Sequence, residues 1–386
     1  MTIDHLKAEF EKKFNKPVSH IFFCPGRVNL IGEHIDYNGG MVMPCAITMG
    51  TTVLISKNDD HIFRFRAVDF PETVDVSLQS AYSKTGPEWF NYPIGVINEF
   101  TKAGVALSGM DFLFSGNLPI GSGLSSSASI EVLTAHAINE LFNNGDLSKV
   151  ELALLGKRVE NDFMGLNSGI MDQFAVAMGK DSNAVLLNCD TLDYEYLPFE
   201  IGDYVLAIIN TNKPRKLVES KYNERFSECR TALKQLQQKL NVTHLCEVTI
   251  EAFAENRSLI NDPVVENRAL HVVSEDERVK KAKDALVSGD IKTFGELMYA
   301  SHHSLQTLYE VSGTELDTIV DFCKTYTGCI GARMTGAGFG GCAIALIKKD
   351  RFDDFSNKIT AYYEEHIGYK PGVFSSVIAD GVRTIV

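Results

Sequence analysis

The sequence PGRVNLIGEHIDYNGG, residues 25–40, is the most informative stretch of the chain and the starting point for predicting its fold. It places Arg27, the carboxylates of Glu33 and Asp36, and the imidazole of His34 among several glycines. Carboxylates and an imidazole offer many hydrogen-bonding atoms, which suits a ligand rich in hydroxyl groups, such as a sugar. On residue type alone, the alternative is a buried polar turn that closes the start of a sheet.

A second motif, LPIGSGLSSSAS at residues 118–129, lies between a predicted strand (111–115) and a predicted apolar helix (125–142). Its glycines let the backbone curl so that successive N–H groups converge on an anion, and the helix adds its unpaired N-terminal amides. Clustered serines add hydroxyl donors, one of which can also ligate Mg²⁺. The alternative is a serine-capped turn without a ligand. The chain contains no Walker A sequence, so ATP would have to bind through a different loop.

Two shorter motifs complete the set. The sequence GLNSGIMDQF, residues 165–174, puts Asp172 at the start of a predicted helix, where its charge could simply favour the helix dipole. The sequence GAGFGG, residues 336–341, fits the pattern G-x-G-x-x-G but precedes a predicted strand (342–347), whereas a dinucleotide fingerprint needs a helix there. By itself this cluster indicates a glycine-rich hairpin with no ligand.

The four motifs, in this order and spacing, resemble those of galactokinases, a family within the GHMP kinase superfamily, and the resemblance spans almost the whole chain. It implies an α+β fold of two lobes with mixed sheets and the active site in the cleft between them. It also implies ATP-dependent phosphorylation of α-D-galactose at O1, giving galactose 1-phosphate and ADP, the first committed step of galactose use by the Leloir pathway. Two positions depart from the family pattern: Ser168 stands where many relatives have cysteine, and Ala337 where many have glycine.

The resemblance also implies roles for individual residues. Asp172 would accept the proton of the sugar hydroxyl, and Arg27 would assist by neutralising charge as the phosphoryl group moves. The expected contacts are Glu33, His34, Ile35, Asp36, Asp172 and Tyr222 for the sugar; Ala67, Gly123, Leu124, Ser125, Ser126, Ser127, Ala128 and Ser129 for ATP; and Ser129 and Glu160 for Mg²⁺.

Apolar periodicity predicts the surrounding elements and a boundary near residue 200, which gives lobes at 1–200 and 201–386. Expected strands cover residues 21–24, 41–47, 51–56, 61–68, 111–115, 184–187, 204–210, 328–334 and 341–347. Expected helices comprise one that carries Leu6, Phe10 and Phe14, one from Tyr222 to Leu240, and others at 89–102, 125–142, 148–163, 168–178, 275–287, 291–309 and 315–325.

Composition sets limits on the class of protein. The 386 residues are 45% hydrophobic and 23% charged, which is typical of a soluble globular protein. The formal net charge of −13 argues against broad nucleic-acid binding and means that local amides and a metal ion must capture anionic ATP. Without a bilayer-length apolar run or the apolar core of a signal peptide, we expect a cytoplasmic protein with no membrane partner. We also expect a monomer that binds no nucleic acid. The eight cysteines form no C-x-x-C pair and are expected to be free thiols.

Two alternatives to a galactokinase stay open at this point. A sibling kinase could act on another sugar such as N-acetylgalactosamine, since the EHID cluster cannot report on a 2-substituent. Some galactokinase relatives are instead galactose-sensing co-inducers of transcription without catalysis. Those relatives lack the pair Ser127-Ala128, which this chain retains, so the sequence favours an active kinase.

Overall fold

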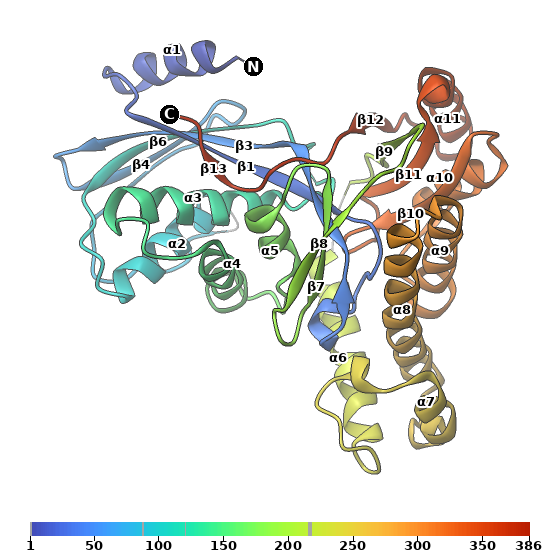
Figure 1. The fold of residues 1–386 in the computed structure, drawn as a ribbon. Coiled ribbons are helices and arrows are strands. Elements are labelled where there is room, and N and C mark those ends of the chain that lie inside the picture. The colour runs from blue at the N-terminus through green and yellow to red at the C-terminus, as the bar shows by residue number, and fades with distance from the viewer. Residues whose placement is uncertain (1, 87–88, 120, 215–217) are drawn as a thin grey trace.

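The first half of the chain, together with one strand from the C-terminal end, builds a six-stranded sheet in the order β13–β1–β3–β6–β4–β5 (Figure 1). The computed structural model describes residues 2–86, 89–119, 121–214 and 218–386, so Ile120 of the second motif lies outside the described residues. The strands are β1 (His20–Asn29), β3 (Pro44–Asn58), β4 (Ile62–Ala67), β5 (Thr73–Ser77), β6 (Gly109–Gly116) and β13 (Arg383–Thr384).

Helices cover both faces of this sheet, because successive side chains along each strand point to opposite faces. Ile21 and Leu54 point to one face and pack with Phe10 of α1, whereas Phe22 and Val53 point to the other face and join the main core. Figure 1 accordingly shows α1 on one side of the sheet and α2 to α5 on the other. These helices are α1 (Ile3–Phe14), α2 (Asn91–Lys102), α3 (Ser126–Phe142), α4 (Lys149–Arg158) with the π-helical turn η2 (Val159–Met164), and α5 (Met171–Met178).

The second half builds a four-stranded antiparallel sheet in the order β10–β11–β9–β12. Its strands are β9 (Tyr204–Asn210), β10 (Cys329–Thr335), β11 (Cys342–Lys348) and β12 (Gly372–Ser376). The helices of this half are α6 (Val218–Leu236), α7 (Ile250–Asn256), α8 (Pro263–Val287), α9 (Ile291–Ser304) with the π-helical turn η5 (Leu305–Tyr309), α10 (Thr314–Thr325) and α11 (Phe352–Ile367).

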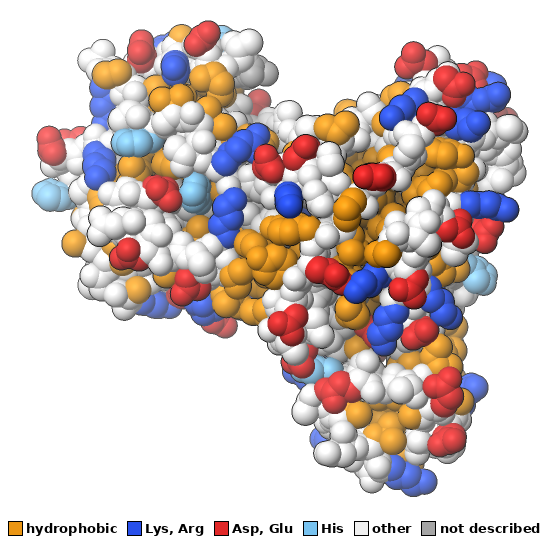
Figure 2. All heavy atoms as spheres, in the orientation of Figure 1, with side chains coloured by type: hydrophobic (Ala, Val, Ile, Leu, Met, Phe, Trp, Pro, Cys, Tyr) orange, Lys and Arg blue, Asp and Glu red, His pale blue; other side chains and the backbone are white. Residues whose placement is uncertain are grey.

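A third sheet, β2–β7–β8, lies between the two halves, and α8 packs against it (Figure 1). Its strands are β2 (Met41–Val42), β7 (Asn183–Asn188) and β8 (Tyr194–Pro198). One short 3-10 turn, η1 (Asp36–Asn38), lies inside the first motif. On the face drawn in Figure 2, acidic and basic side chains are interspersed over both halves.

Most expected elements are present, and two kinds of difference bear on the site. The strands expected at 41–47 and 51–56 are β2 and one long β3, because β3 pairs with β1 on one side and β6 on the other through most of its length. The helices expected at 148–163 and 291–309 end in π turns, which apolar periodicity cannot reveal. The division at residue 200 stays a prediction, since β13 returns to pair with β1.

Two expectations from composition can be compared with the structure. All eight cysteines are free thiols, and five of them are buried. Within the described residues, no helix has both the length and the apolar character that crossing a bilayer requires.

Candidate active site

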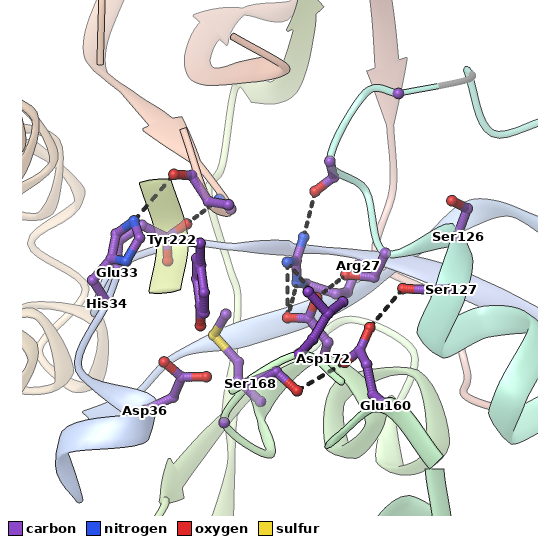
Figure 3. A pocket seen from close by; sticks show the side chains of 18 residues that line it. Arg27, Glu33, His34, Asp36, Ser126, Ser127, Glu160, Ser168, Asp172 and Tyr222 are labelled. Carbon is purple, nitrogen blue, oxygen red and sulfur yellow. Dashed lines mark hydrogen bonds and ion pairs between the residues drawn. The ribbon is translucent and has the colours of Figure 1, made fainter. Parts of the chain in front are cut away.

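A pocket of about 250 Å³ is lined by residues from both halves of the chain (Figure 3). The first half contributes Arg27, Glu33 and Asp172, and the second half contributes Tyr222 and Gly336. All four motifs therefore meet around one cavity. The fold brings them together although the first and the last are separated by about three hundred residues, as the hydrogen bond between Glu33 and Gly336 shows.

Arg27 and Asp172 form the central ion pair of the pocket. Arg27 Nε and Nη2 donate to the two carboxylate oxygens of Asp172 at 2.9 and 2.8 Å, and Nη1 donates to the Gly123 carbonyl at 2.8 Å. The register of β1 shifts between Pro25 and Arg27, and such a bulge redirects the side chain that follows it. Burial lowers the pKa of Arg27, but the charges of Asp172 and Glu33 and the hydrogen bonding to Asp172 together outweigh it, so the net pKa is raised and the guanidinium stays charged.

The serine of the second motif (residues 118–129) that lies nearest to this pair is Ser125. It precedes α3 in the left-handed region with φ of 62°, and its hydroxyl makes no capping bond to the helix. The hydroxyl instead donates to Asp172 at 2.6 Å. The alternative of a simple serine-capped turn therefore does not describe Ser125.

Glu33 is a buried carboxylate held by both halves. Its two oxygens accept hydrogen bonds from the Gly336 backbone amide and the Asn29 side-chain amide. Burial raises the pKa of Glu33, and the nearby guanidinium groups of Arg333 and Arg27 oppose that rise. Because Gly336 has φ of 82° and an added Cβ would lie 2.9 Å from the Gly123 carbonyl, glycine is required at this contact.

The next three residues of the first motif (residues 25–40, called the signature below) present different groups to the pocket. His34 has φ of 63°, lines the pocket and places Nε2 3.2 Å from the Ala337 carbonyl. The side chain of Ile35 is fully buried in the core, so only its backbone could reach a ligand. Burial, and then the negative charge of Asp172, raise the pKa of Asp36 to about 7.

Tyr222, on α6, also lines the pocket, and its ring lies beside the imidazole of His34 with the centroids 5.5 Å apart. Figure 3 shows Tyr222 between His34 and Asp172, with Asp36 close by. The structure thus brings the expected sugar-binding side chains together, apart from that of Ile35.

A second pocket of about 1000 Å³ adjoins the first and shares Gly121, Ser126 and Ser127 with it. Ala67 lines this second pocket, together with the aromatic residues Phe70, Trp89, Tyr92 and Phe114. The side chains of Leu124 and Ala128 are buried in the core, so these residues have only backbone groups to offer.

The serine beside Glu160 is Ser127. Ser127 Oγ donates to Glu160 Oε1 at 3.0 Å, and both residues line the first pocket (Figure 3). Ser168 and Gln173 donate to the other oxygen of Glu160 at 2.9 and 2.8 Å. Burial, and then the charge of Asp172, raise the pKa of Glu160. Its position in the widened turn η2 directs it toward this cluster.

The expectation that Ser129 is a Mg²⁺ ligand needs correction. Ser129 is fully buried, and its hydroxyl lies 2.9 Å from the Cys24 carbonyl and 3.1 Å from Thr51 Oγ1. These contacts direct it toward the sheet and away from the pocket that holds Glu160. Ser127 is the serine of this motif that occupies the expected place.

Several hydrogen bonds around the pocket could not be predicted from the sequence. Asn29 and Gln173 lie inside the quoted motifs, so the sequence shows that they are polar. It does not show that Asn29 bonds Glu33 or that Gln173 bonds Glu160. Gln173 additionally donates to the buried carboxyl of Glu131 at 3.0 Å. Glu131 and Arg333 belong to no recognised motif and carried no sequence signal.

Comparisons with known proteins agree with this geometry. Residues 8–57 match the family model of the galactokinase galactose-binding signature, residues 91–180 the GHMP kinases N terminal domain, and residues 282–365 the GHMP kinases C terminal model. The chain is 51% identical over 385 residues to a galactokinase of Clostridium tetani, covering 100% of this chain and 98% of the relative. It is 46% identical over 388 residues to a galactokinase of Streptococcus thermophilus, covering 100% of both.

Solved structures give the same result. The crystal structure of Lactococcus lactis galactokinase complexed with galactose matches with a TM-score of 0.96 and 44% identity, covering 99% of this chain and 100% of that chain. The mevalonate kinase of Methanococcus jannaschii matches with a TM-score of 0.70 and 22% identity, covering 94% of this chain and 99% of that chain, a likeness of fold alone.

The mixed sheets, the matched domains and the serine-rich loop beside the ion pair define a GHMP kinase-like fold, which confirms the expected fold class. The galactokinases of Clostridium tetani and Streptococcus thermophilus share about half of their residues with this chain over nearly their full length. The chain belongs to the galactokinase family.

Proposed function

We propose that this chain transfers the γ-phosphoryl group of ATP to the 1-hydroxyl of α-D-galactose, giving galactose 1-phosphate and ADP. The observation that carries the proposal is the Arg27–Asp172 pair, which is tied to the serine-rich loop through Ser125 and Gly123. The pocket that holds this pair adjoins a larger second pocket, and the two share residues of the same loop. The galactose in the Lactococcus lactis structure supports a sugar for the smaller pocket.

Phosphoryl transfer depends mainly on positioning and on stabilising charge, and these residues can supply both. Asp172 accepts the proton of the attacking hydroxyl, because its carboxylate reaches into the pocket and is 30% exposed. Arg27 keeps that carboxylate oriented through two parallel hydrogen bonds. Its fixed positive charge also stabilises the charge that develops on the transferring group.

The sugar hydroxyls are bound by acceptors and donors around the rest of the smaller pocket. Glu33 and Asp36 supply carboxylate oxygens, and Tyr222 supplies a phenolic hydroxyl. Glu33 is fixed from both halves of the chain, so its unshared lone pairs point in defined directions. A site built to bond specific hydroxyls rejects sugars that present them in another geometry.

ATP binds in the second pocket with its phosphates against the serine-rich loop. Ser126 and Ser127 line both pockets, and Ser126 is the first residue of α3. Unpaired amides and the positive end of the helix dipole favour phosphate at this position. Aromatic residues such as Trp89 and Phe114 provide apolar walls for a base in the outer part of the pocket.

The donor set beside the loop fits Mg²⁺. Mg²⁺ takes hard oxygen ligands and is usually held by one or two carboxylates together with substrate phosphates. Glu160 supplies a buried carboxylate and Ser127 a hydroxyl, 3.0 Å apart and facing the phosphate side of the pocket. A bound Mg²⁺ would neutralise phosphate charge.

Replacing Ser127 with alanine should raise the Mg²⁺ concentration needed for half-maximal activity more than it raises the galactose KM. Loss of one oxygen ligand should weaken the metal by about tenfold or more, by analogy with the loss of a charge-assisted hydrogen bond. Replacing Ser129 with alanine is the matched control, since it removes a buried hydroxyl of the same helix. Mg²⁺ titrations that respond to Ser129→Ala and not to Ser127→Ala would contradict this assignment.

The pH dependence of galactose use should report Asp36. Below pH of about 7, Asp36 takes up a proton because its pKa is raised to about 7, and the neutral acid offers the sugar one acceptor fewer. We expect kcat/KM for galactose to fall by about tenfold for each pH unit below that value. Asp36→Asn should be impaired at high pH and should lose this limb. An unchanged limb in Asp36→Asn would assign the titration to another group.

An ADP-release assay with galactose, glucose and N-acetylgalactosamine tests the proposal directly. Galactose should give by far the highest kcat/KM. Comparable values for glucose and galactose would refute a galactose-specific site, and a preference for N-acetylgalactosamine would identify the sibling kinase. Binding of galactose and ATP without release of ADP would identify the sensor. The cytoplasmic location and the monomeric state expected from the sequence remain predictions.

A further inference from the structure

His34 begins a chain of buried polar groups that leads away from the reacting centre. Its Nδ1 lies 2.9 Å from the Tyr37 hydroxyl, which lies 2.7 Å from the Tyr309 hydroxyl. The Tyr309 hydroxyl in turn lies 3.1 Å from the sulfur of Cys229. Tyr309 and Cys229 are no more than 1% exposed. The four groups come from the signature, η1, η5 and α6, so this series of hydrogen bonds crosses from one half of the molecule to the other.

The second ring nitrogen of His34 fixes the direction of these hydrogen bonds. Nε2 lies 3.2 Å from the Ala337 carbonyl oxygen, which can only accept, so Nε2 carries a hydrogen. In a neutral imidazole Nδ1 is then the acceptor, and the Tyr37 hydroxyl must donate to it. Tyr37 therefore accepts from Tyr309, and Tyr309 accepts from the thiol of Cys229.

The surroundings of His34 favour the neutral ring that this direction requires. Burial, and then the nearby charge of His271, lower the pKa of His34 to about 3. The ring of Tyr309 packs against the imidazole with centroids 4.9 Å apart. At neutral pH, the remaining question is which nitrogen carries the single hydrogen.

That choice matters because the Ala337 carbonyl is half of a two-point contact. The Gly336 amide donates to Glu33, and the next residue, Ala337, accepts from His34. Two consecutive residues of the glycine motif thus bond two consecutive residues of the signature with opposite polarity. In the other tautomer, a lone pair of His34 would face the lone pairs of Ala337, and this half of the contact would be lost.

We propose that Tyr37, Tyr309 and Cys229 form a hydrogen-bond relay that holds His34 as the Nε2–H tautomer and so positions the glycine motif, residues 336–341, over the sugar pocket. The relay residues are positioning residues, because Tyr37, Tyr309 and Cys229 line neither pocket. The inference rests on the proposed function, because the contact that it protects borders the pocket assigned to galactose.

Two features of the fold support this placement independently. Tyr309 lies in η5, and π turns are rare and are frequently found at functional sites. Cys229 follows Tyr222 by about two turns of α6, so both residues face the same side of the helix. The relay therefore also fixes the helix that carries a pocket-lining tyrosine.

Nitrogen NMR of histidine-labelled protein tests the tautomer without any activity measurement. The His34 signals are assigned by their absence in His34→Asn. At neutral pH the wild-type protein should show a protonated Nε2 and an unprotonated Nδ1. Tyr37→Phe keeps the Ala337 contact but removes the donor to Nδ1, so it should populate both tautomers. A charged His34, or a hydrogen on Nδ1 in the wild type, would overturn the inference even if the protein phosphorylates galactose.

Kinetics with conservative variants test the positioning role. Loss of the donor to Nδ1 in Tyr37→Phe should raise the galactose KM by about tenfold and change kcat by less than about threefold. Cys229→Ala should shift KM in the same direction, whereas Cys229→Ser keeps a donor and should restore the wild-type value. Unchanged KM and tautomer in Tyr37→Phe and Tyr309→Phe would overturn the relay.

Two controls separate the possible causes of failure. Tyr196→Phe removes a hydroxyl that donates to the Met178 carbonyl at 2.7 Å outside the relay, and it should change neither KM nor the His34 signals. If Tyr37→Phe does not fold, the wild-type spectrum and the Cys229→Ala and Cys229→Ser pair still decide the question. A folded wild-type protein that releases no ADP with galactose would refute the proposed function alone, because the spectrum remains measurable.

Discussion

Replacing Asp172 with asparagine should lower kcat by about 10²- to 10⁴-fold, the usual cost of losing a general base, while galactose still binds. Asparagine keeps the shape of the side chain and one oxygen for Arg27, but it cannot accept the proton of the sugar hydroxyl. Steady-state ADP release gives kcat, and calorimetric titration with galactose gives binding. Retention of more than about a tenth of the wild-type kcat, only about 1.4 kcal/mol of barrier, would show that Asp172 is not the base.

Asp111 offers a matched control for this substitution. It is also a buried carboxylate paired with an arginine, with Arg64 Nη1 3.0 Å from its Oδ1. It lies on β6 and lines neither pocket. Asp111→Asn should therefore lower the stability of the protein and leave kcat near the wild-type value.

Replacing Arg27 with lysine should lower kcat by about 10²- to 10³-fold, comparable to the loss of an oxyanion donor. Lysine keeps the charge, but one ammonium group cannot reproduce the two bonds to Asp172 and the third to the Gly123 carbonyl. Both the orientation of the base and the anchoring of the serine-rich loop would be weakened. The measurement is kcat at saturating galactose and ATP.

Arg66→Lys serves as the control, because Arg66 pairs with Asp75 at the surface, with its Nη1 2.7 Å from the carboxylate. That variant should keep its activity. A fall in kcat of less than about tenfold in Arg27→Lys would mean that charge alone matters at this position, whatever the geometry of the donors.

The fold class could be predicted from the sequence because the four motifs, in their order and spacing, resemble those of galactokinases. Residues 25–40 and 118–129 each limit the local structure severely, and both converge on one site. Their partners across the chain could not be predicted in the same way. The bond between Gly336 and Glu33 joins positions that only the complete fold brings together.

Ser127 and Ser129 illustrate the limit of reading a motif. The sequence shows clustered serines, but successive residues of a helix are rotated by about 100°, so two positions apart they face nearly opposite sides. Ser127 faces Glu160, and Ser129 faces the carbonyl of Cys24 in the sheet. The side to which a residue points depends on where α3 starts. The structure starts α3 at Ser126, and Ser125 lies before it with its hydroxyl bonded to Asp172.

The relay proposed around His34 could not be predicted from the sequence for a different reason. Tyr309 and Cys229 are ordinary residues for a helix core, and nothing in their neighbours along the chain distinguishes them from packing residues. Their significance comes from hydroxyl and thiol groups that meet in three dimensions. Such buried polar contacts are found only when every donor and acceptor has been assigned a partner.

Because of the two π turns at residues 159–164 and 305–309, the number of residues in these segments matters as much to the site as their identity. Each turn holds one residue more than an α-helical turn would, and that extra residue sets the direction of Glu160 or Tyr309. Removing it would let the helix continue regularly and would rotate these side chains by about 100°. The shortened helix would gain conformational stability while the site lost its geometry. Engineering that regularises helices for thermostability should therefore leave both turns intact.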